Sequence, residues 1–166
     1  HPILLRGGGD LATGVAYRLH HAGFPLIVTE LPNPLVVRRR VALATAVLDG
    51  EVVVESLRAV RAKTPSGAWA LAQTGDIPVL VTPGVPFEWS AAGGSVADNR
   101  PSVIIDARMA KRNIDTTIDQ APLVIGMGPG FTAGVDCRAF IETNRGHRLG
   151  RVIWDGALEL APWSIT

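Results

Sequence analysis

Three consecutive glycines stand between a short apolar run and a helical pattern near the start of the sequence. Residues 3–5 are apolar, residues 7–9 are all glycine, and apolar residues then recur at helical spacing over residues 11–22. Glycine permits the backbone angles of a tight turn and lets a ligand approach the main chain closely. The free N–H groups and the dipole at the start of a helix favour an anion such as phosphate. The stretch therefore predicts a strand, a turn and a helix that bind a phosphate-bearing ligand.

The same stretch fits the alanine-ended form of the dinucleotide fingerprint. The next apolar run ends at Glu30, about 20 residues further on, where an acid that binds the ribose of NAD is expected. Such an acid disfavours a 2′-phosphate, so NAD is favoured over NADP, although arginines 38–40 would reverse that preference if they held the phosphate. The alternative is a tight turn without a ligand. The residues expected at the ligand are Gly7, Gly8, Gly9, Asp10, Leu11, Ala12, Thr13 and Glu30.

A second glycine-rich loop, at residues 126–134, follows another apolar run, and Asp106 and Arg108 follow a third. Because the carboxyl ends of parallel strands meet at one edge of a sheet, we expect both loops to form the walls of a single cleft. The alternative is that the second loop makes a subunit contact anchored by Phe131. The ligand-binding residues predicted here are Asp106, Arg108, Gly128, Gly130 and Thr132, with Arg108, Lys111, Arg145 and His147 as a basic rim.

Candidate catalytic residues are few, and whether the protein is an enzyme stays open at this point. His147 is expected in a turn, where it would act as an acid or base with Asp136 or Glu142, or serve a structural role. Cys137 would have a lowered pKa if it lay near a helix N-terminus or arginines, and otherwise it is a small buried residue. No Ser-His-Asp pattern and no metal-ligand cluster is recognisable from the spacing.

Length and composition favour a single globular domain over residues 1–166. The chain is 47% hydrophobic, which excludes a disordered protein. Its net charge of +1 gives no sign of the basic surface that nucleic-acid binding requires. We expect a long loop at residues 83–101 and a candidate C-terminal addition at residues 143–166. No apolar run approaches the roughly 20 residues of a membrane span, and no signal peptide precedes the first strand, so a cytoplasmic protein is expected. A single cysteine excludes an internal disulfide.

Alternating strand and helix patterns predict an α/β fold, a Rossmann-like three-layer domain with a mainly parallel sheet and the first strand at its centre. Two alternatives stay open for residues 51–55 and 58–63: the two segments pair as a hairpin, or they are irregular. The predicted strands are residues 3–6, 24–30, 77–81, 103–105, 123–127, 140–142 and 149–154, and the predicted helices are residues 11–22, 35–48 and 64–75.

Four motifs carry a resemblance to a known family. Residues 7–16, 106–111, 128–137 and 141–151 resemble the YqeB-type family of accessory or maturation proteins for selenium-dependent molybdenum hydroxylases. The resemblance extends over nearly the whole chain. It also implies a relation to XdhC/CoxI-type xanthine dehydrogenase accessory proteins, which carry a Rossmann-like domain. The implied partners are a molybdenum hydroxylase client and a nucleotide or pterin ligand, and a homo-oligomer is a further expectation.

The sequence supports two functional hypotheses, and a third requires no bound nucleotide. The first is a maturation factor for a xanthine dehydrogenase-like enzyme that binds a nucleotide or the molybdenum cofactor. The second is an NAD(P)-dependent oxidoreductase, for which His147 is the only acid–base candidate on the substrate side. The third is a structural chaperone that uses the fold without a nucleotide. NAD(P) and a molybdopterin-type cofactor therefore both stand as candidate ligands.

Overall fold

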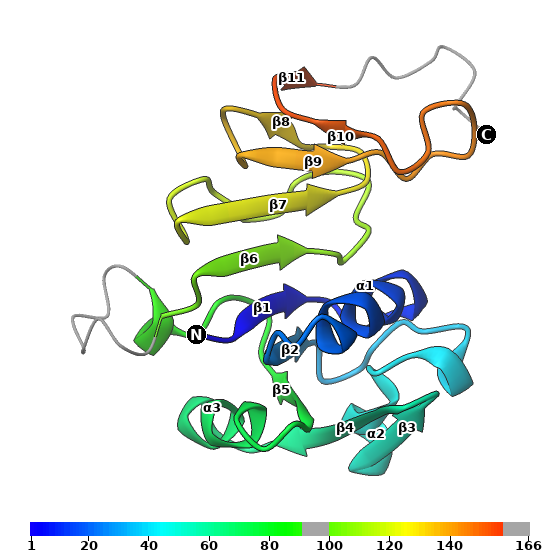
Figure 1. Ribbon diagram of the computed structural model, residues 1–166, viewed down its shortest axis with the longest axis vertical. Coiled ribbons are helices and arrows are strands. Elements are labelled where there is room, and N and C mark those ends of the chain that lie inside the picture. Colours follow the sequence, from blue (N-terminus) through cyan, green and yellow to red (C-terminus); the bar gives the residue numbers. More distant parts are fainter. Residues whose placement is uncertain (91–99, 158–166) are drawn as a thin grey trace.

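A nine-stranded sheet runs through the whole molecule in the computed structural model, which describes residues 1–90 and 100–157 (Figure 1). The strand order is β10-β9-β7-β6-β1-β2-β5-β4-β3. The strands are β1 (Ile3–Arg6), β2 (Leu26–Glu30), β3 (Glu51–Val54), β4 (Leu57–Ala62), β5 (Ile77–Val81), β6 (Val103–Asp106), β7 (Leu123–Met127), β9 (Ala139–Ile141) and β10 (Val152–Ile153), and two short strands, β8 (Thr132–Ala133) and β11 (Gly156–Ala157), pair separately.

The central six strands are parallel and have the order of a dinucleotide-binding fold. The order of these six strands in the sheet is β5-β2-β1-β6-β7-β9. If they alone are numbered 1 to 6 along the chain, this is the order 3-2-1-4-5-6 of that fold. Strand β4 continues the parallel sheet, while β3 and β10 are antiparallel strands at its two edges. Ile3 of β1 pairs with Leu26 on one side and Val103 on the other. The prediction of a Rossmann-like, mainly parallel sheet with a central first strand is therefore confirmed.

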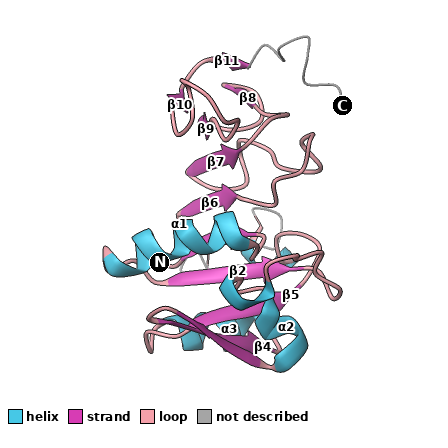
Figure 2. Ribbon diagram, turned by 90° about the vertical axis from the view of Figure 1, so that its right-hand side faces the viewer, coloured by secondary structure: helices cyan, strands magenta, loops and turns pink. Residues whose placement is uncertain are grey.

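Three helices cover the sheet around β1 and β2, as Figure 2 shows. Helices α1 (Asp10–His21) and α2 (Thr45–Asp49) pack on the face to which Leu5 points, and α3 (Pro65–Ala72) packs on the face to which Leu4 points. Helix α3 begins where the hydroxyl of Thr64 accepts a hydrogen bond from the N–H of Gly67 at 3.1 Å. Proline at the first helical position suits this start because its missing N–H would have no partner there.

The helix predicted over residues 35–48 is wrong. Only η1 (Arg39–Val41) and α2 are helical there, and Leu35 and Val37 are 93% and 97% exposed. The chain takes an extended step at Ala42, after which the N–H groups of Leu43 and Ala44 donate to Thr13 Oγ1 at 3.1 Å and to the Gly8 carbonyl at 2.8 Å. Bonding this segment to the glycine loop is incompatible with one continuous helix.

Other differences from the predicted elements are local. Residues 51–54 and 57–62 do form an antiparallel hairpin, whereas the strand predicted over 149–154 is reduced to β10 because residues 146–151 turn. The long loop contains η2 (Phe87–Trp89), whose Trp89 is buried with its ring 5.9 Å from that of Trp69, and the loop's residues 91–99 lie outside the described residues. Among the described residues, no helix has the length and apolar character needed to cross a membrane.

Candidate functional site

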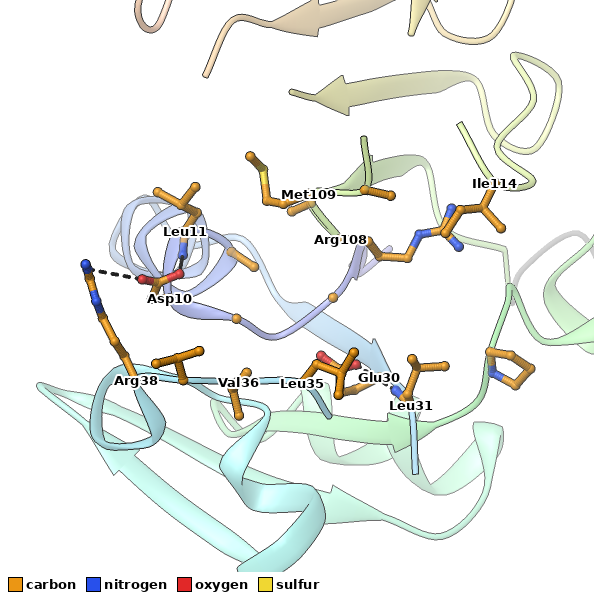
Figure 3. Close-up of a pocket in the computed structure, with 17 residues that line it drawn as sticks. Asp10, Leu11, Glu30, Leu31, Leu35, Val36, Arg38, Arg108, Met109 and Ile114 are labelled. Atoms are coloured by element: carbon orange, nitrogen blue, oxygen red, sulfur yellow. Dashed lines mark hydrogen bonds and ion pairs between the residues drawn. The ribbon is translucent and has the colours of Figure 1, made fainter. Parts of the chain in front are cut away.

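A pocket of about 660 Å³ lies at the carboxyl ends of β1, β2 and β6, where the strand order reverses (Figure 3). Open α/β sheets bind their ligands at this position. The glycine loop after β1 and the start of α1 form one part of the lining. The loop after β2 forms a second part, and the segment after β6 forms a third. The lining residues are Gly7, Gly9–Ala12, Glu30, Leu31, Leu35–Arg38, Pro83, Ala107–Ala110 and Ile114.

The three glycines of the first loop have different roles. Gly7 has a φ of +91°, and a Cβ added to it would lie 2.9 Å from the Cα of Arg108. A Cβ on Gly8 would lie 2.9 Å from the backbone N of Ala44. A Cβ on Gly9 would meet no protein atom within 4 Å, and Gly9 lines the pocket. The fold therefore requires glycine at the first two positions, whereas the third leaves space for a ligand.

Glu30 lies at the end of β2 and holds the glycine loop. Its Oε2 accepts a hydrogen bond from the N–H of Gly8 at 2.8 Å, and its Oε1 accepts one from the N–H of Leu31 at 2.7 Å. Each carboxylate oxygen has further lone pairs for a hydroxyl or N–H group of a ligand. The N–H of Gly8, which we predicted to bind phosphate, is thus already satisfied.

The start of α1 also carries its own carboxylate. Asp10 Oδ1 accepts a hydrogen bond from the N–H of Leu11 at 2.9 Å, and Oδ2 lies 3.3 Å from Arg38 Nη1. Figure 3 shows the Arg38 side chain reaching across to Asp10. Within the described residues, the N–H groups of Gly9, Asp10 and Ala12 have no acceptor. A negatively charged ligand at these groups would compete with Asp10 for Arg38.

A network of charges, buried at Arg6 and Asp106 and half-exposed at Asp115, fixes the third part of the lining. Arg6 donates to Thr116 Oγ1 at 2.8 Å and to Asp115 Oδ1 at 2.7 Å. Arg108 donates to both oxygens of Asp106, at 3.0 and 2.6 Å, and to Asp115 Oδ1 at 2.7 Å. The two residues predicted to contact a ligand, Asp106 and Arg108, therefore bond to each other. Sequence reasoning missed Arg6, Asp115 and Thr116, although an arginine that ends an apolar strand is a signal of a buried charge partner.

The network shifts the pKa values of all four of its charged side chains. Burial alone would raise the pKa of Asp106, but hydrogen bonds from Arg108 and Thr116 outweigh it and hold the pKa below its ordinary value. Burial likewise opposes the ionisation of Asp115, yet Arg108 and Arg6 lower the pKa of this carboxyl. Burial and the charge of Arg108 lower the pKa of Arg6, while Asp106 raises that of Arg108 in spite of burial.

The second glycine loop packs behind this lining segment. A Cβ on Gly130, whose φ is +94°, would lie 2.5 Å from the Cα of Arg112. A Cβ on Gly128 would lie 3.3 Å from the Cε of Met109, a residue that lines the pocket. Among the described residues, the pocket lining includes neither Gly128, Gly130 nor Thr132. The segment after β6 therefore separates the second loop from the pocket, and the expectation that the loop forms a wall is not met.

The structure does not support Phe131 as the anchor of a subunit contact, the alternative role for the second loop. Phe131 is only 5% exposed, and its ring packs so closely over Gly126 that an added Cβ there would lie 2.5 Å from Phe131 Cγ. Asp136 accepts a hydrogen bond from the N–H of Thr132 at 2.9 Å, so its carboxylate closes the turn of this loop. The loop is a packing element of the second half of the sheet.

Among the described residues, none of the catalytic candidates His147, Asp136 and Cys137 lines the pocket. Cys137 is fully buried, and burial raises the pKa of its thiol, the opposite of what a reactive cysteine needs. His147 is exposed in a turn and is not among the residues that line the pocket, and the same holds for Lys111 and Arg145. In the described parts of the chain, no group of three or more His, Cys, Asp or Glu residues is arranged to hold a metal ion.

Comparison with known proteins gives one informative match. A protein of Escherichia coli strain K12 named YqeB, described as uncharacterized, is 46% identical over 157 residues, which are 95% of this chain. The chain is a homologue of this part of YqeB. It spans only 28% of the length of YqeB. No family model matches the chain, and no solved structure matches it.

The similarity to YqeB supports the family resemblance that the four sequence motifs carry. Two of these motifs, residues 7–16 and 106–111, contain pocket-lining residues. The other two, residues 128–137 and 141–151, include the packing loop and the exposed turn around His147. The YqeB-like motifs therefore divide between the pocket and the second half of the sheet.

Proposed function

We propose that this chain binds a nucleotide or the molybdenum cofactor in the pocket beside β1. We further propose that it serves as an accessory or maturation factor for a xanthine dehydrogenase-like molybdenum hydroxylase. The observation that carries the binding proposal is the placement of Glu30. Its carboxylate is fixed on the glycine loop, in a pocket at the reversal of a parallel sheet. The maturation role rests on the resemblance to the YqeB-type family.

The shape and chemistry of the pocket support a ligand of this class. Its volume of about 660 Å³ lies within the roughly 300–1,000 Å³ typical of small-molecule sites. Apolar side chains after β2, such as Leu31 and Val36, and Met109 after β6 suit the flat faces of an adenine or pterin ring. Glu30 would accept hydrogen bonds from ribose hydroxyls or from pterin N–H groups. A phosphate would accept hydrogen bonds from the N–H groups of Gly9 and Ala12. It would also bind Arg38 if it displaced Asp10 from that arginine.

The position of Glu30 bears on which dinucleotide would bind. A carboxylate that is already fixed by two backbone N–H groups repels the 2′-phosphate of NADP. Of the three arginines that would reverse this preference, only Arg38 lines the pocket, and it pairs with Asp10. We therefore propose NAD rather than NADP if the ligand is a nicotinamide dinucleotide.

The alternative of an NAD(P)-dependent oxidoreductase has less support. Such an enzyme needs an acid or base beside the transferred hydride. The ionisable residues that line the pocket are Asp10, Glu30, Arg38 and Arg108, and each already has a hydrogen-bond or ion-pair partner. His147 lies outside the lining. These placements favour a protein that binds and presents its ligand over one that turns it over.

Native mass spectrometry tests the proposal against each candidate ligand in turn. The chain is mixed separately with NAD, NADH, NADP, NADPH, CTP and molybdopterin, and the mass of the folded protein is measured. We expect one ligand to bind with a stoichiometry of one per chain and to be lost from a Gly9→Val variant. If none binds at millimolar concentration, the ligand is of another class. Oxidation of NADH or NADPH together with reduction of a substrate would instead establish an oxidoreductase.

A further inference from the structure

One half of the sheet has an apolar face that the described chain leaves partly open. On the α1 side, β6, β7 and β9 present Val103, Leu123, Ile125 and Ile141, all of them only partly buried. Val152 of β10 extends the same face through its pairing with Ile141 and is 43% exposed. We call these five residues the open face. Their strands, β6, β7, β9 and β10, lie above β1 and α1 in Figure 1.

The handedness of the chain explains why this face stays open. Connections between parallel strands are right-handed, so strands added in opposite directions from β1 place their connections on opposite faces of the sheet. Helix α1 joins β1 to β2 on one face. The connections after β6 and β7 pack mainly on the other face, where Ala121, Phe131 and Cys137 join the cluster beside α3, while Met109 after β6 packs on the α1 side. Figure 2 agrees, since loops flank β6 and β7 on the side away from α1.

The open face calls for a covering layer from outside the described chain. Parallel sheets in α/β proteins are covered on both faces. Along the same face, α1 supplies that cover over β1 and β2, where Leu5 and Val28 are fully buried. A second helix beside α1 would extend the layer over β6 and β7. Because the matched region is only 28% of YqeB, most of that longer polypeptide lies outside it and has to pack somewhere.

We propose that the open face is an interface within the longer YqeB-type polypeptide. Its occupant is an amphipathic helix from the part of that polypeptide outside the matched region. This helix lies beside α1, and its aliphatic side chains pack on Ile125. Met109 connects this interface to the pocket, because it packs against the same apolar cluster and also lines the pocket. The covering helix would therefore adjoin the ligand. This proposal does not depend on which ligand binds, or on whether one does.

Cysteine labelling tests the proposal on a single position. Ile125→Cys is made in this chain alone and in a chimera in which the chain replaces the matched region of E. coli YqeB. The native Cys137 is fully buried and adds little background. Val53→Cys is the control, since Val53 is 62% exposed on the edge strand β3, at the opposite end of the sheet. Circular dichroism confirms folding, and co-expression of the two parts as separate chains replaces the chimera if it does not fold.

We expect maleimide to label Ile125→Cys readily in the chain alone and about tenfold or more slowly in the longer protein, because thiol reactivity follows access. The control should react at the same rate in both. Equal rates for Ile125→Cys would overturn the proposal. Protection in the chain alone that depends on concentration would assign the face to a second copy. Protection in the chain alone that is lost on removing residues 158–166 would assign it to those residues. Either result would also overturn the proposal.

Discussion

The two halves of the sheet use the same parallel strands but are stabilised in different ways. In the half around β2 and β5, helices pack on both faces, and Val28 and Val79 are fully buried. In the half around β7, loops cover one face, and Ile125 stays partly exposed on the other. Helices thus cover both faces of the first half, although the apolar cluster on each face continues into the second half. The second half depends on loop packing, on charge pairing with β1 and, in our proposal, on an outside helix.

The two glycine-rich loops show the same contrast. In the first loop, Gly9 has open space beside it and lines the pocket, so its lack of a side chain keeps that space clear. In the second loop, Gly130 has a positive φ and touches the backbone of Arg112, so its lack of a side chain serves packing. Similar composition therefore has different physical causes in the two halves, and, as far as the described residues show, the first loop lines the pocket and the second does not.

The largest effect is expected from breaking the charge network that joins the halves. Asp106→Ala leaves Arg6 and Arg108 without a buried carboxylate, and removing one partner of a buried ion pair costs about 3–5 kcal/mol of unfolding free energy. Urea unfolding followed by circular dichroism measures it. Arg58→Ala is the control, because this exposed arginine pairs with Glu51 and Asp76 at the surface and its loss should hardly move the midpoint. Equal midpoints for the two variants would show that the network does not stabilise the fold.

A pair of truncations compares the two cores directly. Ile77→Ala on β5 removes a fully buried side chain, and such a change costs about 2–5 kcal/mol. Ile125→Ala on β7 removes a side chain that solvent already reaches, so we expect a cost of about 1 kcal/mol in the chain alone. Thermal and urea unfolding of both variants checks this difference. Similar losses would mean that the second half is as well packed as the first.

Sequence patterns predicted the first half better than the second because its signals are local. Apolar runs and a glycine turn define β1, α1 and β2, and Glu30 lies where the fingerprint places its acid. The helix over 35–48 failed because the apolar spacing of Leu35 and Val37 does not show that both face solvent. Asp115 and Thr116, the partners of Arg6, lie 109 and 110 residues further along the chain, so no local pattern reveals them.

A smaller effect is expected at the second glycine loop. Gly130→Ala adds a methyl group against the Arg112 backbone and places alanine at a positive φ, so we expect a loss of about 2 kcal/mol. Gly134 also has a positive φ, but its surroundings are open, so Gly134→Ala should cost about 1 kcal/mol. The comparison, made by urea unfolding, separates backbone strain from steric contact. Equal losses would mean that Gly130 is retained for its backbone angle alone.

The smallest expected effect is the pH dependence of stability. The pKa values of Asp106 and Asp115 are lowered in the folded chain, so the unfolded chain binds more protons as the pH falls below about 4. Their contribution is therefore complete above that pH and is lost as the pH falls through the folded pKa values. Urea midpoints measured from pH 7 to pH 3 should fall more steeply for the wild type than for Asp106→Asn. Parallel profiles would contradict the assigned shift.

The central claim is that the first glycine loop binds a nucleotide or the molybdenum cofactor. Isothermal titration calorimetry tests this claim most directly. Wild type, Gly9→Val and Gly14→Ala are titrated with the ligand found by mass spectrometry, or with NAD if several bind. Gly9→Val places its side chain in open space within the pocket, whereas Gly14 lies further along α1 and does not line it. We predict that Gly9→Val abolishes binding with an unchanged melting temperature, and that Gly14→Ala binds like the wild type. Undiminished binding by folded Gly9→Val would contradict the claim.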